Sequence, residues 1–333
     1  MKLNETQKSI VRSLFLKRQL ARKTLARSLK LSNPGLTLAV KPLVKEGIIA
    51  FATKIVTGKA GRNEEPLCLN QNYGLFAGID AGVSSYHFVL LSLAGFTVFE
   101  ADYTSVKEVM EKLHYYITNS KVVNLCVTFR HYGCHKPFTP MEKELYDALA
   151  NFNEVPVVFK NSIMALAEIH HLYKNDNRTI FLVKYGPELT AAILEDGKRV
   201  RNEKDMCSQI GLTYISEGVT AGVVVDYASI LGKEYEEDEG AMMLINDDEK
   251  LNRVLDVLAL VIYNSDRLFV FDSIVFAGSF LSSPGVFNKL IEKMKALGDK
   301  FDADKVSLFE EYATIYSQKS ALAAFISHFS DKK

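Results

Sequence analysis

The sequence predicts a winged helix-turn-helix over residues 1–70, followed by an α/β body over residues 71–333. The first 70 residues show the apolar period of helices and then two short strand-like runs. From Tyr73 onward, apolar strands alternate with helical segments, which is typical of an α/β architecture. The charge also changes. Residues 1–70 hold 14 Lys and Arg against four acidic residues, so they carry a net charge of +10 and the other 263 residues carry −10.

The elements of the winged helix are predicted in order as helices over residues 4–17, 22–29 and 32–46, then strands over residues 48–56 and 67–69 around a turn at residues 58–62. Ser32 is the expected N-cap of the third helix, and Pro34 fits its first turn. Pro42 lies deep in the same helix, where a proline is expected to kink or shorten it.

The basic N-terminal region predicts binding to double-stranded DNA, because Lys and Arg neutralise phosphates and a helix fits the major groove. The expected contacts are Asn33, Gly35, Thr37 and Lys41 on the third helix, near an exposed Leu38, and Lys59 and Arg62 at the tip of the ribbon. Two alternatives stay open. The charge could be an ordinary solvated surface, or the winged helix could bind a protein.

In the body, strands are expected over residues 75–79, 87–93, 122–129, 155–159, 180–184, 190–194 and 273–277. Helices are expected over residues 106–117, 142–152, 162–173, 251–268, 286–297 and 315–329. The acidic stretch Glu234–Glu239 is interpreted as a solvated loop.

The composition limits the class of protein. With 48% hydrophobic and 24% charged residues, the chain can form a sizeable core, and no run of about 18 apolar residues predicts a membrane span. The basic N-terminus lacks the apolar segment of a secretory signal. The four cysteines contain no C-x-x-C pair, which favours a reducing compartment. A cytoplasmic location is therefore expected.

Gly78-Ile79-Asp80-Ala81-Gly82 resembles the first phosphate motif of actin-like sugar kinases. The order of further motifs is similar to the ROK family (repressors, open reading frames and sugar kinases): Leu31-Ser32, Gly61-Arg62, Leu67-Cys68-Leu69-Asn70, Lys160-Asn161-Ser162-Ile163-Met164-Ala165, Tyr185-Gly186, Asp196-Gly197-Lys198, Tyr227-Ala228-Ser229 and Ala277-Gly278-Ser279. The resemblance covers essentially the whole chain. It implies a two-lobed, actin-like and ribonuclease-H-like body with a cleft, with lobes over about 71–175 and 176–312 and a C-terminal helix over 313–330 that packs back on the first lobe.

The departures from that family predict that the chain is not an enzyme. Ser162 stands where the kinases have the Asp that takes the proton from the sugar, and a neutral hydroxyl is a poor general base. Val83 brings a β-branched side chain into the nucleotide turn. Pro187-Glu188 replaces the Gly-rich tip of the second phosphate loop and places an anion there.

The resemblance also implies that the family's zinc site is lost, because its His and three Cys correspond to Leu212, Ser216, Gly218 and Val223, none of which ligates zinc as N and S donors do. Gln209 replaces the sugar-binding Glu, so sugar sensing is weaker or altered. We expect no cofactor and no metal. His131, Cys134 and His135 form a possible metal cluster, and His170-His171 a further pair, but two adjacent helical histidines point in different directions.

The sequence therefore predicts a DNA-binding transcription regulator, a repressor of carbohydrate-related genes, with an inactive kinase-like body that forms a homodimer. An effector, a sugar or sugar derivative, is expected in the cleft near Asp80, Asn161, Ser162 and Gln209. For Asp80 the alternative is a carboxylate that caps its hairpin, and for Asn161 it is a helix cap. A ROK sugar kinase with an N-terminal extension and a protein-interaction scaffold are the alternative functions.

Overall fold

The computed structural model describes residues 3–52, 66–134, 136–174, 178–200, 210–298 and 301–329. Its N-terminal part, called the winged helix below, contains α1 (Glu5–Lys17), α2 (Arg22–Ser28), α3 (Asn33–Lys45) and a sheet of order β1-β3-β2, formed by β1 (Gln19–Leu20), β3 (Leu67–Leu69) and β2 (Ile49–Phe51). Strand β1 was not predicted, because two residues are too few to show a period. Its pairing with β3 closes the sheet over the helices.

The ends of α1 and α3 are capped by their own sequences. The Asn4 and Gln7 side chains each accept a hydrogen bond from the other's backbone N–H, which is a capping box. Ser32 Oγ accepts from the Gly35 N–H, as expected of an N-cap. Contrary to the expectation for Pro42, α3 continues to Lys45. Pro42 lies on the exposed face, where water can hydrogen-bond the carbonyl that its missing N–H leaves unpaired.

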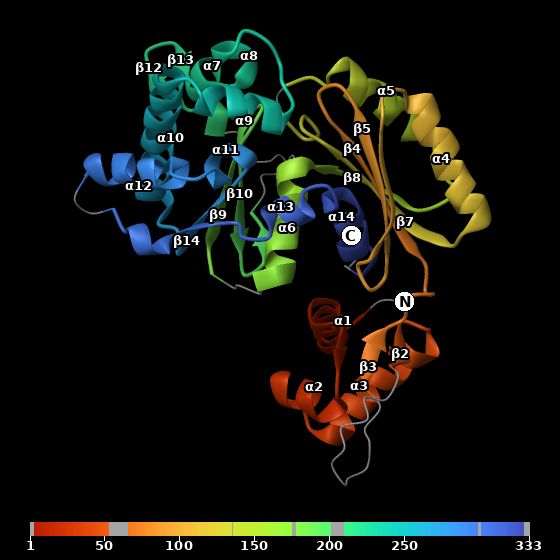
Figure 1. Ribbon diagram of the computed structural model, residues 1–333. Coiled ribbons are helices and arrows are strands. Elements are labelled where there is room, and N and C mark those ends of the chain that lie inside the picture. Colours follow the sequence, from red (N-terminus) through yellow and green to blue (C-terminus); the bar gives the residue numbers. More distant parts are fainter. Residues whose placement is uncertain are drawn as a thin grey trace.

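The first lobe of the body is built on a sheet of order β6-β5-β4-β7-β8. Its strands are β4 (Leu75–Ala81), β5 (Tyr86–Ser92), β6 (Thr97–Tyr103), β7 (Val122–Phe129) and β8 (Val157–Asn161). The helices α4 (Val106–Asn119) and α5 (Pro140–Leu149) pack on one face, and the C-terminal helix α14 (Lys319–Phe329) packs on β4 and β7. Figure 1 shows this lobe on the right, with β4 in orange and α14 in blue.

The second lobe has a sheet of order β11-β10-β9-β14-β15. Its strands are β9 (Ile180–Tyr185), β10 (Leu189–Glu195), β11 (Lys198–Arg199), β14 (Ser273–Ala277) and β15 (Val306–Leu308). Each sheet consists of three consecutive antiparallel strands, of which the first is central in the sheet, with two parallel strands added on its other side. The two lobes therefore repeat one topology, although no sequence repeat is visible.

The second lobe also contains helices α7 (Ala221–Val225), α8 (Tyr227–Ile230), α9 (Glu237–Ile245), α10 (Asp248–Phe269), α11 (Ser279–Ser282) and α12 (Val286–Ala296). A short helix η1 (Ile210–Leu212), the hairpin β12 (Tyr214–Ser216) and β13 (Val219–Thr220), and η2 (Ala303–Lys305) complete it. Between the lobes lie α6 (Ser162–Lys174) and α13 (Tyr312–Ile315). The short elements α7, α8, α9 and α11 were not predicted, because four to nine residues show little periodicity.

Gly78 is required by the packing of α14 against β4. A Cβ atom at Gly78 would lie 2.2 Å from the Ala321 backbone nitrogen and 2.4 Å from Ser320 Oγ. The start of α14 thus lies directly against the central strand β4, and only a glycine allows this approach.

Within the winged helix, α1 makes contacts with the body (Figure 1). The Phe15 ring stacks on Phe325 of α14, with ring centroids 4.7 Å apart. Arg12 Nε donates to the carbonyl of Leu172 over 2.6 Å, and its Nη2 donates to that of Tyr173 over 3.3 Å. One apolar cluster consequently runs from α1–α3 through α6 and α14 into the sheets, so the winged helix is docked on the body.

No helix in the described part of the chain combines the length and the apolar character needed to cross a membrane.

Candidate functional site

Helix α3 presents its predicted DNA-contacting side chains to solvent. Asn33, Thr37 and Lys41 are exposed, and Leu38 beside them is 73% exposed. Gly35 is half-buried, and its N–H is already bonded to Ser32 Oγ. The opposite face of α3 carries the buried residues Leu36, Val40 and Leu43, which anchor the helix in the apolar cluster. The exposed stripe is therefore rigidly held and available to a partner.

Three predicted site residues are not among the described residues. Lys59 and Arg62 of the ribbon and Gln209 of the cleft lie outside the described residues. The remaining cleft residues, Asp80, Asn161 and Ser162, are described, and the structure brings Asp80 and Ser162 together: Ser162 Oγ lies 3.4 Å from Asp80 Oδ1.

The Asp80 carboxylate is paired with Lys319 from the first turn of α14. Thr128 of β7 also donates to Asp80. Burial alone would raise the pKa of Asp80, but the Lys319 ammonium and these hydrogen bonds outweigh it and lower that pKa. Lys319 is only 2% exposed. Asp80 is therefore neither a free metal ligand nor a cap of its hairpin, since its charge is neutralised inside the protein.

The turn that follows β4 binds a carboxylate of the second lobe. The Gly82 N–H donates to the Ser85 carbonyl, which closes the turn. The N–H groups of Val83 and Ser84 both donate to Glu236 Oε1, over 3.0 and 2.8 Å, and the Ser84 hydroxyl donates to the same oxygen over 2.9 Å. Successive backbone N–H groups aimed at one point form a site for an anion, and Glu236 fills it.

Glu237, the next residue, is 4% exposed and is bonded on both oxygens. Its Oε2 lies 2.6 Å from Lys184 Nζ, and its Oε1 accepts from the Ser279 N–H over 2.9 Å and from the Tyr312 hydroxyl. Burial would raise the pKa of Glu237, but Lys184 outweighs it and the pKa is lowered. The interpretation of residues 234–239 as a solvated loop is thus wrong, because helix α9 begins within it and its first carboxylates bind backbone N–H groups.

Asn161 holds the loop after β7. It is 5% exposed, and its Nδ2 donates to the carbonyls of Arg130 and Tyr132 over 2.6 and 3.1 Å. Its Oδ1 accepts from the Ile163 N–H over 3.0 Å, at the start of α6. Of the two alternatives for Asn161, this geometry supports the helix cap.

His131 is surrounded by two carboxylates. Nδ1 lies 2.6 Å from Glu142 Oε2, and Nε2 lies 2.8 Å from Glu188 Oε1. Burial would lower the pKa of His131, but the bonds to Glu142 and Glu188 raise it to about 9. Burial would raise the pKa of Glu188, but its contacts with His131 and Lys136 lower it to about 2. The imidazole is therefore protonated at neutral pH and joins the two lobes as a cation rather than as a metal ligand.

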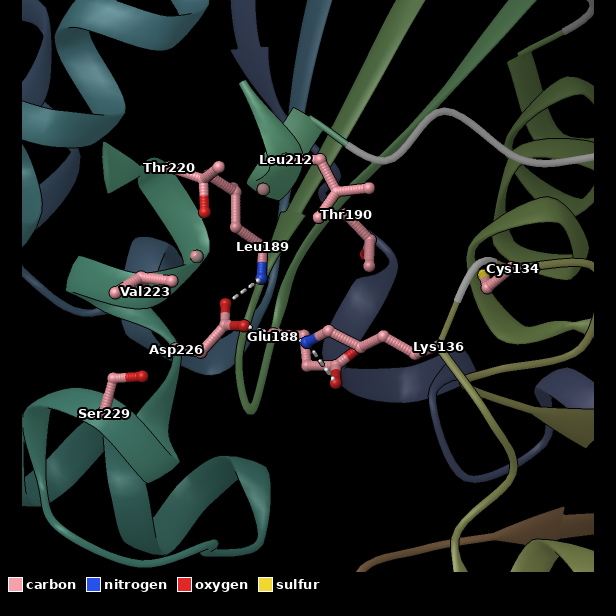
Figure 2. Close-up of a pocket in the computed structure, with 12 residues that line it drawn as sticks. Cys134, Lys136, Glu188, Leu189, Thr190, Leu212, Thr220, Val223, Asp226 and Ser229 are labelled. Carbon is pink, nitrogen blue, oxygen red and sulfur yellow. Dashed lines mark hydrogen bonds and ion pairs between the residues drawn. The ribbon is translucent and has the colours of Figure 1, made fainter. Parts of the chain in front are cut away.

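A cavity of about 210 Å³ lies beside this ion pair, between the lobes (Figure 2). Its walls are formed by Cys134, Lys136, Glu188, Leu189, Thr190, Gly211, Leu212, Thr220, Gly222, Val223, Asp226 and Ser229. Lys136 reaches from the first lobe to Glu188 Oε1 over 2.9 Å and to Asp226 Oδ2 over 3.0 Å. Asp226 Oδ1 accepts from the Leu189 N–H over 3.2 Å. The cavity thus combines charged groups on one side with apolar side chains on the other.

Lys136 is the cation among the residues that line the cavity. Burial would lower the pKa of Lys136, but Asp226 and Glu188 raise it. Burial raises the pKa of Asp226 above its ordinary value despite the nearby Lys136. Glu188 is ionised throughout the physiological range. Of the three charged residues here, only Glu188 could be singled out from the sequence, because Lys136 and Asp226 resemble ordinary surface residues until the lobes are folded together.

The chain has the ROK fold. A ROK family transcriptional regulator, described as a homologue of the Escherichia coli Mlc protein, superposes with a TM-score of 0.65 at 14% identity, over 98% of this chain and 99% of that one. A ROK family protein from Streptococcus pneumoniae in complex with sucrose gives 0.60 at 14% identity, over 76% and 98%. No protein-family model matches the sequence, and no curated protein sequence does.

The likeness to a ROK kinase covers a smaller share of this chain. A ROK hexokinase from Thermus thermophilus gives a TM-score of 0.54 at 10% identity, over 77% of this chain and 100% of that one. The predicted fold, a winged helix-turn-helix followed by a two-lobed α/β body, is therefore confirmed.

The ROK fold raises the question of whether this chain's residues fit a magnesium nucleotide, and they do not. The carboxylate suited to a metal, Asp80, is bonded to Lys319. The N–H groups suited to a phosphate, those of Val83 and Ser84, are bonded to Glu236. Both polar requirements are already met from within the chain.

Zinc does not fit either. Of the four positions that the resemblance equates with zinc ligands, Leu212 and Val223 line the cavity with apolar side chains, while Ser216 ends β12 and Gly218 lies in the turn before β13. None offers a nitrogen or a sulfur to zinc. Within the described residues, no three His, Cys, Asp or Glu side chains converge as a metal site. His135, part of the possible cluster, lies outside them.

Proposed function

We propose that this protein is a DNA-binding transcription regulator, a repressor of carbohydrate-related genes in the cytoplasm, with a kinase-like body that does not catalyse phosphoryl transfer. The observation that carries the proposal is the exposed stripe Asn33, Thr37 and Lys41 on α3, held by a buried opposite face within a region of net charge +10. A helix of this kind enters the major groove, and the surrounding Lys and Arg bind phosphates. The likeness to a ROK regulator, which extends over the winged helix, supports it.

A non-catalytic body is supported by the cleft. Ser162 lacks the basicity to take a proton from a sugar hydroxyl, and Asp80 is held in an ion pair with Lys319. With Glu236 in the turn, neither the metal nor the phosphate of a nucleotide has free protein groups to bind.

The effector is proposed to bind in the cavity at Lys136, Glu188 and Asp226, whose lining residue Cys134 contacts the predicted cleft residue Asn161. Its volume of about 210 Å³ is smaller than the roughly 300–1,000 Å³ of sites for drug-sized ligands, so it suits a small polar molecule. Carboxylates and an ammonium can hydrogen-bond sugar hydroxyls, while Leu189, Leu212 and Val223 offer apolar contact. A related fold has been solved with sucrose, which supports a carbohydrate as the class of ligand.

A homodimer is proposed to present two α3 helices to successive major grooves of an inverted-repeat operator, with residues 71–333 providing the contact. An effector then changes DNA affinity only if it prefers one arrangement of the lobes. Light scattering of the full chain tests the dimer, and a monomer at micromolar concentration would contradict it.

The DNA-binding proposal is tested by fluorescence anisotropy with a labelled duplex of random sequence at 50 and 200 mM salt. We expect binding that weakens by orders of magnitude over this range, because bound phosphates release counterions. Lys41→Glu should weaken it further, because α3 then repels the duplex. Lys289→Glu, the same charge change at an exposed position of α12, is the matched control and should leave binding unchanged. A Lys41→Glu variant that binds as well as the parent would refute the assignment of α3.

A further inference from the structure

The disagreement between the cleft and a bound nucleotide has a specific structural cause. The turn Gly82–Ser85 corresponds in position to the first phosphate motif, and it retains the backbone geometry of an anion site. Its two free N–H groups, those of Val83 and Ser84, converge on one oxygen of Glu236. A Cβ atom at Gly82 would lie 3.3 and 3.4 Å from the two carboxylate oxygens, so the carboxylate lies directly over the glycine.

We infer that the Glu236 carboxylate is an internal ligand that takes the place of a nucleotide phosphate in the turn Gly82–Ser85. Glu236 belongs to the second lobe and the turn to the first, so the contact also joins the lobes. Because the ligand is part of the chain, its effective concentration is far above that of any dissolved phosphate compound. The site is therefore occupied whether or not nucleotide is present.

Two neighbouring contacts follow the same pattern. The Glu237 carboxylate accepts a hydrogen bond from the N–H of Ser279. Ser279 is the last residue of the turn Ala277-Gly278-Ser279, which is similar to the late glycine turn of the kinases. Lys319 places an ammonium on Asp80, the carboxylate that would otherwise face a metal ion. Two carboxylates and one ammonium of the chain thus stand on the polar groups that a magnesium nucleotide would use.

The charge distribution across the lobes supports this assignment. In these contacts between the lobes, the first lobe contributes the turn N–H groups, Arg130, His131 and Lys136, whereas the second contributes carboxylates. Arg130 Nη2 lies 3.4 Å from Glu234 Oε2, two residues before Glu236. A first-lobe surface that attracts anions is suited to the phosphates of a nucleotide, and here it attracts the acidic start of α9.

The test uses hydrogen–deuterium exchange of the full chain, read at the Val83 and Ser84 amides. In Glu236→Ala these amides should exchange at least tenfold faster than in the parent, because they lose hydrogen bonds to a charged acceptor. Glu239→Ala is the matched control: it removes an exposed carboxylate from the same helix and should leave the turn protected. Glu236→Gln keeps the size of the side chain and should give a smaller increase, which covers the case in which the alanine variant folds poorly.

The anion site itself is tested by adding inorganic tripolyphosphate. In Glu236→Ala it should restore the protection of Val83 and Ser84, whereas in the parent it should change nothing, because Glu236 already fills the turn. Unchanged exchange in Glu236→Ala would show that the carboxylate does not hold the turn. Lost protection that tripolyphosphate does not restore would show that the turn is not an anion site, and equal binding of tripolyphosphate to the parent would show that Glu236 does not occlude it. None of these outcomes depends on DNA binding.

Discussion

Helix α3 and the cleft between the lobes carry polar side chains of similar chemistry, but they use them in opposite ways. On α3, Asn33, Thr37 and Lys41 are exposed, although the Thr37 hydroxyl also donates to the Asn33 carbonyl. In the cleft, Asp80 and Asn161 are bonded to groups of the same chain. A polar group that is paired inside a protein contributes to stability, and one left exposed is available for recognition. Substitutions in the two regions should therefore separate stability from binding.

The largest effect on stability is expected for Lys319→Met. The substitution leaves the Asp80 carboxylate buried without its cation, so the free energy of unfolding should fall by about 3–5 kcal/mol in urea titrations. The double variant Asp80→Asn, Lys319→Met removes both charges and should recover part of the loss. A loss of unfolding free energy below about 1 kcal/mol for Lys319→Met would show that the pairing of Asp80 contributes no more to stability than the exposed side chains of α3 do.

His131 should make stability depend on pH. Its pKa is raised from 6.5 to about 9, so the stability that it contributes is fully present below pH 6.5 and is lost as the pH rises through 9. This difference corresponds to about 3 kcal/mol. Urea unfolding at pH 6, 7.5 and 9 should show the decline in the parent and a flatter profile in His131→Gln. Equal slopes in both proteins would mean that the imidazole is not held by Glu142 and Glu188.

Two asparagines provide the most direct comparison. Asn161→Ala deprives the carbonyls of Arg130 and Tyr132 of their donor and should cost about 1–3 kcal/mol of unfolding free energy. Asn33→Ala changes an exposed side chain of α3 and should stay within about 0.5 kcal/mol of the parent while weakening DNA binding. Thermal unfolding and anisotropy of the same two samples measure both properties. Similar losses of stability in both variants would remove the contrast between the regions.

The smallest effect, namely no gain of catalytic activity, is expected for Ser162→Asp. A carboxylate at the position that the resemblance equates with the kinase base should produce no ATP turnover with glucose or N-acetylglucosamine, because Lys319 still holds Asp80 and Glu236 still fills the turn. A coupled assay for ADP release checks this. Sugar-dependent turnover above background, in the parent or in the variant, would favour the kinase function instead.

Much of the fold was predictable because its signals are local. Ser32 is the N-cap of α3 and Pro34 lies in its first turn, and both act on backbone groups within one helical turn. The buried strands of both lobes are continuous apolar runs of a length that indicates strands. Strand β6 was missed because it lies at the sheet edge and its outward residues include Glu100 and Asp102.

The cleft was less predictable because its partners are distant in the chain. Lys319 and Asp80 are 239 positions apart, and Glu236 is 153 positions from Val83. The sequence of an acidic stretch does not distinguish a glutamate that faces water from one that accepts hydrogen bonds from backbone N–H groups. One local signal was Pro187-Glu188 in place of the Gly-rich tip of the second phosphate loop, and the Glu188 carboxylate is paired with His131 and Lys136.

Helix α6 gives the molecule a rigid connection between its two ends. Its first turn lies beside Asp80 and the Asn161 cap, and the carbonyls of its last turn hold Arg12 of α1. Thirteen residues of helix span about 20 Å and resist compression along their axis because every turn is hydrogen-bonded to the next. The helix is thus a rigid connection between the cleft and α1: a displacement of its cleft end is passed to Arg12, and through α1 to the orientation of α3, the helix that we propose contacts DNA.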